Sequence, residues 1–139
     1  MGAWSEGNFG NDDAGDWIYV LEKSKGTDTL LKPIKAIIAN DDYIESPDCS
    51  EALAASEVIA ASLTKDNSII PEEALNWLNK KPGLFGKKPQ IEKEYAALAK
   101  QSVQKILKSS ELRDLWEETE DFSKWQEVQL NLINKLNKV

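Results

Sequence analysis

The sequence contains no histidine, and this absence excludes several classes of catalytic chemistry. Ser–His–Asp and Cys–His nucleophiles need an imidazole as general base, and imidazole is the commonest transition-metal ligand. A bound metal would need oxygen ligands, which favours magnesium or calcium. The clustered acids Asp12, Asp13 and Asp16 do not have the spacing of a calcium-binding loop. We therefore predict no catalytic residue of these kinds, no metal and no cofactor.

Cysteine is almost absent as well. Cys49 is the only one in 139 residues, so an internal disulfide is impossible and a reducing compartment is expected. Cys49 falls in the first turn of a predicted helix, a position that can lower the pKa of a thiol. Because no histidine is present to activate it, we interpret Cys49 as a small buried hydrophobic residue.

Long hydrophobic runs are missing too. No apolar stretch approaches the roughly 20 residues that a membrane-spanning helix needs. The first residues also lack the basic start and apolar stretch of a secretory signal. We expect a cytoplasmic protein with no membrane partner. Hydrophobic residues make up 41% of the chain, which suits a single globular helical domain over residues 1–139.

Positive charge is scarce in the first part of the chain. The net charge is -7, and residues 1–59 hold twelve acidic residues against four lysines. This balance argues against nucleic acid, whose binding depends on neutralising phosphates. It favours a partner protein with a basic surface. Residues 80–108 carry eight lysines and two glutamates, which we interpret as a solvated face.

The apolar residues recur at helical spacing, and strand-like alternation is nowhere convincing. We predict an all-α fold, a single compact bundle of six or seven helices. An ordered arm rich in Gly and Trp (residues 1–10) precedes the first helix, and an exposed loop rich in Lys, Pro and Gly covers residues 80–90. Ser46 is expected to cap the third helix, with Pro47 at its first position. The expected helices begin near Asp12 and Asp28 and then cover about 47–63, 72–78, 91–108, 110–119 and 121–137.

Glu57 is the only charged residue between Ala52 and Leu63, in a segment rich in alanine. Small side chains let neighbouring helices approach closely, which indicates a central place in the bundle. A carboxylate there is either partly buried with a raised pKa or paired with a donor. We favour a core glutamate held by a hydrogen bond from a Trp N–H or a Lys, and keep Glu57 as a possible functional carboxylate. The acidic pairs Glu111–Asp114 and Glu117–Glu120 are interpreted as solvated helix faces.

The amino-terminal residues also carry a family resemblance. They are similar to the pattern M-G-x-W-x-x-G-x-F-x-N-D-x-A-x-D-W of a bacterial family, domain-of-unknown-function family 4259. The matching positions are Gly2, Trp4, Gly7, Phe9, Asn11, Asp12, Ala14, Asp16 and Trp17. Ser5 stands where many members have a second glycine, which makes the loop less permissive. Residues 43–47 with Glu57, and residues 110–116, resemble a second and a third block. The resemblance implies an intact fold and a bacterial origin, and no particular activity.

Aromatic residues beside aspartates, as in the first block, are the mixture found at interface hot spots. We predict a small protein-binding module that uses its acidic front half. Its most concrete version is an immunity protein that neutralises a bacterial toxin or effector by covering a basic surface. The predicted interface residues are Trp4, Asp12, Asp13, Asp16, Asp41, Asp42, Glu45 and Asp48.

Two alternatives belong to other classes. One is a magnesium-dependent hydrolase of a nucleotide or phosphate ester, with Glu57, Glu45 and Asp16 as the metal ligands. The other is a homo-oligomeric scaffold. The sequence leaves the oligomeric state and the identity of the partner open.

Overall fold

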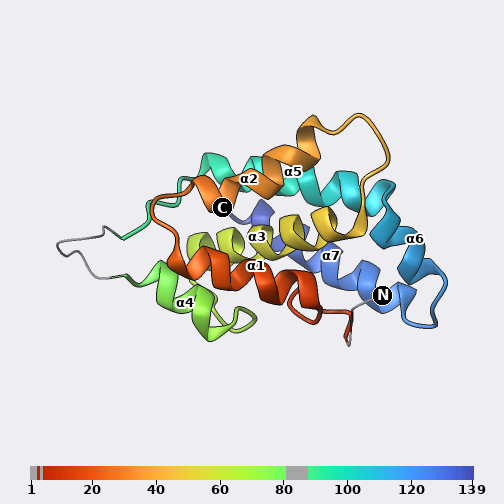
Figure 1. The fold of residues 1–139 in the computed structure, drawn as a ribbon, viewed down its shortest axis with the longest axis horizontal. Coiled ribbons are helices and arrows are strands. Elements are labelled where there is room, and N and C mark those ends of the chain that lie inside the picture. Colours follow the sequence, from red (N-terminus) through yellow and green to blue (C-terminus); the bar gives the residue numbers. More distant parts are fainter. Residues whose placement is uncertain (1–2, 4, 81–87) are drawn as a thin grey trace.

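The computed structural model describes residue 3, residues 5–80 and residues 88–139. Within these ranges the chain forms seven helices, and its one β-bridge is isolated (Figure 1). The helices are α1 (Asp12–Lys23), α2 (Asp28–Ala39), α3 (Ser46–Thr64), α4 (Glu72–Leu78), α5 (Glu94–Lys108), α6 (Glu111–Glu117) and α7 (Phe122–Asn137). The predicted all-α bundle is confirmed. Trp4 and residues 81–87 of the predicted exposed loop lie outside the described residues.

The helix starts follow local capping signals in two places. The Asn11 side chain accepts a hydrogen bond from the Ala14 N–H at 2.8 Å and caps α1. The Ser110 hydroxyl does the same for α6, accepting from the Arg113 N–H at 3.0 Å. Each cap satisfies one of the N–H groups that a helix start leaves free.

The start of α3 departs from the prediction. The helix begins at Ser46, with Glu45 in the capping position and no side-chain cap, so the prediction that Ser46 caps it is wrong. The Ser46 N–H instead donates to the Glu111 carboxylate of α6 at 2.8 Å. A contact between helices 65 residues apart thus satisfies an N–H that a local cap satisfies elsewhere.

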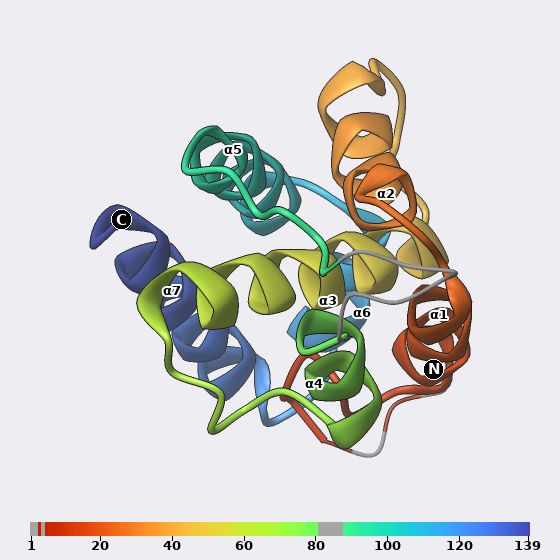
Figure 2. The same ribbon diagram turned by 90° about the vertical axis from the view of Figure 1, so that its left-hand side faces the viewer.

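Helix α3 is the centre of the molecule. Every residue from Ala52 to Ala61 is buried, and α3 packs against α1, α2, α5, α6 and α7. Figure 2 shows it crossing the molecule between α2 and α5 on one side and α1 and α4 on the other. The Ser56 and Ser102 hydroxyls lie 3.4 Å apart, which shows how closely α5 approaches. The central place predicted from the alanine-rich sequence is confirmed.

The two shortest helices close opposite ends of the bundle (Figure 1). Helix α4 packs against α1, where the Trp77 indole N–H donates to the Ser24 carbonyl at 3.2 Å. Helix α6 lies at the other end, beside the start of α3. Within the described residues, no helix combines the length and the apolar character that crossing a membrane requires.

Lys105 of α5 has a structural role that the sequence did not indicate. Its ammonium group donates to the carbonyl oxygens of Ile37 at 2.9 Å and Ile38 at 3.3 Å, and also to that of Asn40. These carbonyls lie at the carboxyl end of α2, where a helix has free acceptors and favours a cation. The interpretation of residues 80–108 as a solvated face is therefore wrong for Lys105.

The arm before α1 folds back on itself and is fastened to α7. The Gly10 N–H donates to the Gly7 carbonyl at 3.0 Å, and the Ser5 N–H donates to the Gly10 carbonyl at 3.3 Å. The buried amides of Asn8 and Gln129 donate to each other, at 3.0 and 2.8 Å. This reciprocal pair satisfies both side chains and fixes the arm across the bundle.

Candidate functional site

Four segments meet at one end of the molecule, on the right in Figure 1: the starts of α1 and α3, the α2–α3 connection, and α6. Asp13, Ser46 and Leu112 from three of them line one small cavity. The segments carry the carboxylates of Asp12, Asp13, Asp16, Asp41, Asp42, Glu45, Asp48, Glu51, Glu111, Asp114 and Glu117. We call this region the acidic end.

Backbone and side-chain hydrogen bonds fasten α6 to the α2–α3 connection. The Glu111 N–H donates to the Ile44 carbonyl at 2.9 Å, and the Tyr43 hydroxyl donates to the Asp114 carboxylate. This second bond is the main reason why the pKa of Tyr43 rises to about 12. The acids of α6, interpreted from sequence as solvated faces, thus adjoin the predicted interface residues. Arg113 offsets part of their charge, through Glu117 at 2.9 Å and Asp114 at 3.9 Å.

A cleft of about 410 Å³ opens between α1, α2 and α3. Asp16, Asp48 and Glu51 supply carboxylates to it, and Lys32 is the basic residue in its lining. Burial raises the pKa of Glu51, the charges of Asp48 and Asp13 raise it further, and Lys32 lowers it. Like charges are therefore crowded around this acidic cleft, a condition that an incoming cation relieves.

Glu51 is a site residue that the sequence reasoning missed. It lies three residues after Asp48 on the same helix, and residues at this spacing share a face. This spacing is the feature of the sequence from which Glu51 could have been identified. The acids of α6 gave no comparable signal, because their proximity to α3 depends on tertiary packing.

Most predicted interface residues are free to meet a partner. Asp12, Asp16 and Asp48 are exposed, as are the side chains of the α2–α3 connection (Asp41, Asp42 and Glu45), and Asp13 is half-buried. The ion pairs within the described ranges join Arg113, Lys124 and Lys135 to other acids, and none includes these seven. The structure brings Asp16 and Asp48 into one cleft, whereas the connection places its three acids outside that cleft.

Comparison with known protein families identifies the family of this chain. A family model with the description Domain of unknown function (DUF4259) matches residues 2–128. The chain belongs to this family. No curated protein and no solved structure matches it. In this DUF4259 protein, segments 43–47 and 110–116, which carried two parts of the resemblance, are joined by the Ser46–Glu111 and Tyr43–Asp114 hydrogen bonds.

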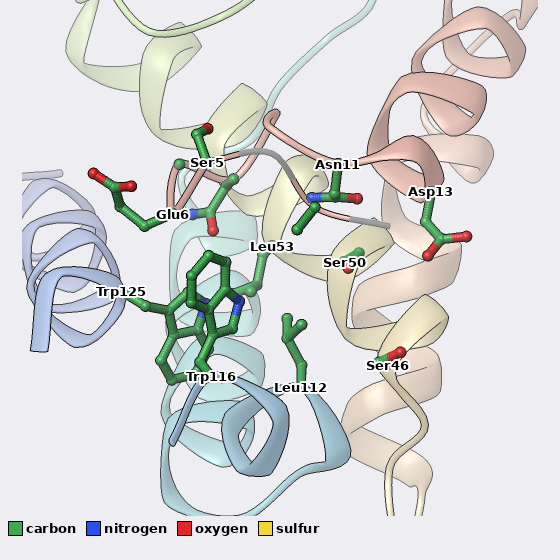
Figure 3. A pocket seen from close by; sticks show the side chains of 13 residues that line it. Ser5, Glu6, Asn11, Asp13, Ser46, Ser50, Leu53, Leu112, Trp116 and Trp125 are labelled. Carbon is green, nitrogen blue, oxygen red and sulfur yellow. The ribbon is translucent and has the colours of Figure 1, made fainter. Parts of the chain in front are cut away.

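The arm of the DUF4259 protein covers a small cavity at the acidic end (Figure 3). The indole rings of Trp116 and Trp125 lie on one side of it, and Ser46 and Ser50 at the beginning of α3 lie on the other. Its volume of about 30 Å³ has room for a water molecule or two. We therefore assign this cavity to the packing of the arm rather than to ligand binding.

A larger cleft, of about 600 Å³, lies beside α7. We call it the Glu57 cleft. It is lined by Gly7, Asn8, Glu57, Asp66, Ile69, Val128, Asn131, Leu132, Asn134, Lys135 and Lys138. Burial raises the pKa of Glu57 to about 7, the charge of Lys135 lowers it, and that of Asp66 raises it.

Two charged residues that line this cleft, Lys135 and Asp66, are already paired with each other. Lys135 forms an ion pair with Asp66 at 3.1 Å. Asp66 also accepts hydrogen bonds from the Ser68 hydroxyl and N–H, and these bonds with Lys135 lower its pKa to about 2. Glu57 itself makes no hydrogen bond to another described residue. The prediction that a Trp N–H or a Lys holds Glu57 by a hydrogen bond is therefore wrong for the described residues.

The three ligands predicted for a magnesium-dependent hydrolase are not brought together. Glu57 lines the Glu57 cleft, Asp16 lines the acidic cleft, and Glu45 lines neither. Across residues 3, 5–80 and 88–139, no group of three or more Cys, Asp and Glu side chains is arranged to hold a metal ion.

Cys49 behaves as the sequence predicted. It is fully buried on α3, and its thiol lies 3.9 Å from the Ile44 carbonyl. Burial raises the pKa of the thiol to about 11. A thiol that remains protonated at neutral pH is a poor nucleophile, so Cys49 contributes packing rather than chemistry.

Proposed function

We propose that this protein is a small binding module that holds a basic partner protein at its acidic end. The observation that carries the proposal is the convergence of carboxylates from α1, α3, the α2–α3 connection and α6 on one end of the bundle. Nine of the eleven, all but Asp114 and Glu117, form no ion pair with another described residue. A surface of one sign attracts an oppositely charged partner and speeds its capture.

The acidic cleft is the best place for an anchoring contact. It offers carboxylates at Asp16, Asp48 and Glu51 beside the apolar side chains of Trp17 and Val20. A lysine or arginine of the partner fits both features, because its methylene groups cover apolar surface while its charged head meets the carboxylates. Val20 is 58% exposed, which leaves apolar surface open to such a side chain.

The most concrete version of the proposal is a cytoplasmic immunity protein. Toxins that act on nucleic acid carry basic surfaces that bind phosphate groups. A protein that presents a dense group of carboxylates can cover such a surface in place of the substrate. This version explains a site with much charge and without a described metal-binding cluster or an activated nucleophile.

The test compares two variants with the same change in net charge. The acidic-end variant carries Asp12→Lys, Asp16→Lys and Asp48→Lys. The control variant carries Glu72→Lys, Glu92→Lys and Glu94→Lys, which are exposed and lie outside the acidic end. In each variant, two substitutions fall in the first turn of a helix (Asp12 and Asp48 in one, Glu72 and Glu94 in the other), so the cost to helix starts is matched.

Each tagged protein is used to capture partners from a lysate of the organism that encodes it, and the captured proteins are quantified by mass spectrometry. We expect a basic protein to be captured by the wild type and the control variant and to be lost with the acidic-end variant. Equal capture by all three proteins, or capture of acidic proteins only, would contradict the proposal.

A further inference from the structure

The Glu57 cleft has a feature that the acidic end does not explain. Glu57 is 4% exposed, and its side chain lines the cleft from the central helix α3. It accepts no hydrogen bond from another described residue and forms no ion pair with one. Buried carboxylates are normally hydrogen-bonded or paired with a cation, because an isolated buried charge is costly. No fully buried side-chain oxygen of the described residues lacks a partner, so the Glu57 carboxylate oxygens reach the open cleft and can accept hydrogen bonds from a group that enters it.

The charged neighbours of Glu57 do not use this capacity. On α7, Lys135 is committed to Asp66 at 3.1 Å, and Lys138 is exposed. From the loop after α3, Asp66 adds a second negative charge near Glu57. Lys138 forms no ion pair with a described residue, but the charges that shift the pKa of Glu57 are those of Lys135 and Asp66.

The remainder of the cleft is built for a small molecule. Val128 and Leu132 of α7 and Ile69 of the loop after α3 provide apolar walls, and Asn131 and Asn134 add amide groups. Helix α7 packs beside α3 (Figure 2). These side chains line the same cleft as Glu57. The volume of about 600 Å³ lies within the range of small-molecule sites, which combine apolar walls with a few placed polar groups.

We propose that the Glu57 cleft binds a small organic cation, with an ammonium or guanidinium head against Glu57 and an apolar body against Val128, Leu132 and Ile69. An anion is disfavoured beside Glu57, because Glu57 and Asp66 repel it and Lys135 is already paired, which leaves the exposed Lys138 as the unpaired cation among the described lining residues. A metal ion is disfavoured because a single carboxylate lies at this depth, whereas magnesium and calcium need several oxygen ligands.

The test uses hexylammonium as the probe and the neutral, similarly sized 1-hexanol as its comparison. Methyl signals of Val128, Leu132 and Ile69 are followed by NMR during titration. Glu57→Gln removes the charge and keeps the shape of the side chain. Glu22→Gln, at a half-buried acid that lines neither the Glu57 cleft nor the acidic cleft, is the matched control. We expect saturable shifts with hexylammonium in the wild type and the control, and an affinity at least tenfold weaker in Glu57→Gln.

The pH dependence of the wild type gives a second measurement that needs no variant. A carboxyl group with a pKa of about 7 is mostly neutral at about pH 5.5 and mostly ionised at about pH 8.5. Asp66, whose pKa is about 2, keeps its charge over this range. The affinity for hexylammonium should therefore rise by roughly thirtyfold between these two pH values, in step with ionised Glu57.

Three results would overturn the proposal: 1-hexanol binding as tightly as hexylammonium, Glu57→Gln binding as tightly as the wild type, or an affinity that does not change with pH. Each leaves the proposed partner surface untouched, because the acidic cleft and the Glu57 cleft share no lining residue.

Discussion

At the scale of single residues, Glu57 is the position where the sequence departs most from what a stable core needs. It occupies the middle of a helix whose residues from Ala52 to Ala61 are all buried. An apolar residue there would avoid the cost of burying an ionised carboxylate. The pKa of about 7 means that this cost is present at physiological pH.

Replacing Glu57 by Gln should stabilise the free protein, and by more as the pH rises. The folded-state pKa of about 7 lies above the ordinary value of 4.5, so the folded protein binds this proton more tightly than the unfolded chain. The wild type therefore loses stability as the pH rises from about 4.5 to about 7, by up to about 3 kcal/mol. Urea unfolding of both proteins at several pH values measures the difference in their free energies of unfolding. If ionised Glu57 instead accepted a structural hydrogen bond, Glu57→Gln would be less stable than the wild type.

At the scale of helices and loops, the sequence was sufficient for whatever is encoded locally. The all-α class follows from apolar residues at helical spacing, and Asn11 and Ser110 cap their helices from within three residues. The start of α3 was predicted incorrectly because the Ser46 N–H donates to the Glu111 side chain, which belongs to a helix distant in the sequence. The role of Lys105 at the end of α2 was missed for the same reason.

In the candidate sites, too, the sequence indicated single residues, whereas the clefts that contain them depend on tertiary packing. Asp16 and Asp48 were predicted as interface residues from charge and position, and the cleft that contains both is formed by the packing of α1, α2 and α3. Glu57 was singled out because it is the lone charge in an apolar helix. The Glu57 cleft could not be predicted, since its walls come from α7 and from the loop after α3.

The arm gives a prediction at this scale, which compares Gly10 in the arm with Gly15 in α1. A methyl group added at Gly10 would lie 1.9 Å from the Ser5 hydroxyl and 3.2 Å from the Ser5 carbonyl oxygen. Gly10→Ala should therefore destabilise the fold by about 1–3 kcal/mol through overpacking.

Gly15 provides the control with the opposite sign. It lies inside α1, and an added methyl group would meet nothing within 4 Å. Gly15→Ala should stabilise the protein by about 1 kcal/mol, because alanine favours the helix. The melting temperatures of both variants, compared with that of the wild type, test these two predictions. A Gly10→Ala protein as stable as the wild type would contradict close packing between Gly10 and Ser5 in the arm.

At the scale of the whole molecule, charge and packing are distributed unevenly. Packing is concentrated on α3, which contacts five other helices. Negative charge is concentrated where α1, α3 and α6 meet, although clustered like charges repel one another and reduce stability. A surface that keeps this charge is consistent with the proposal that the acidic end binds a basic partner protein.

The most direct test of that claim is the association rate of the captured partner with the wild type, the acidic-end variant and the control variant, measured in low and high salt. Electrostatic capture predicts that the wild-type and control rates fall by at least about tenfold between about 0.02 M and about 0.5 M salt. The acidic-end variant should associate slowly at both concentrations. Rates that are insensitive to salt, or equal in all three proteins, would contradict the account.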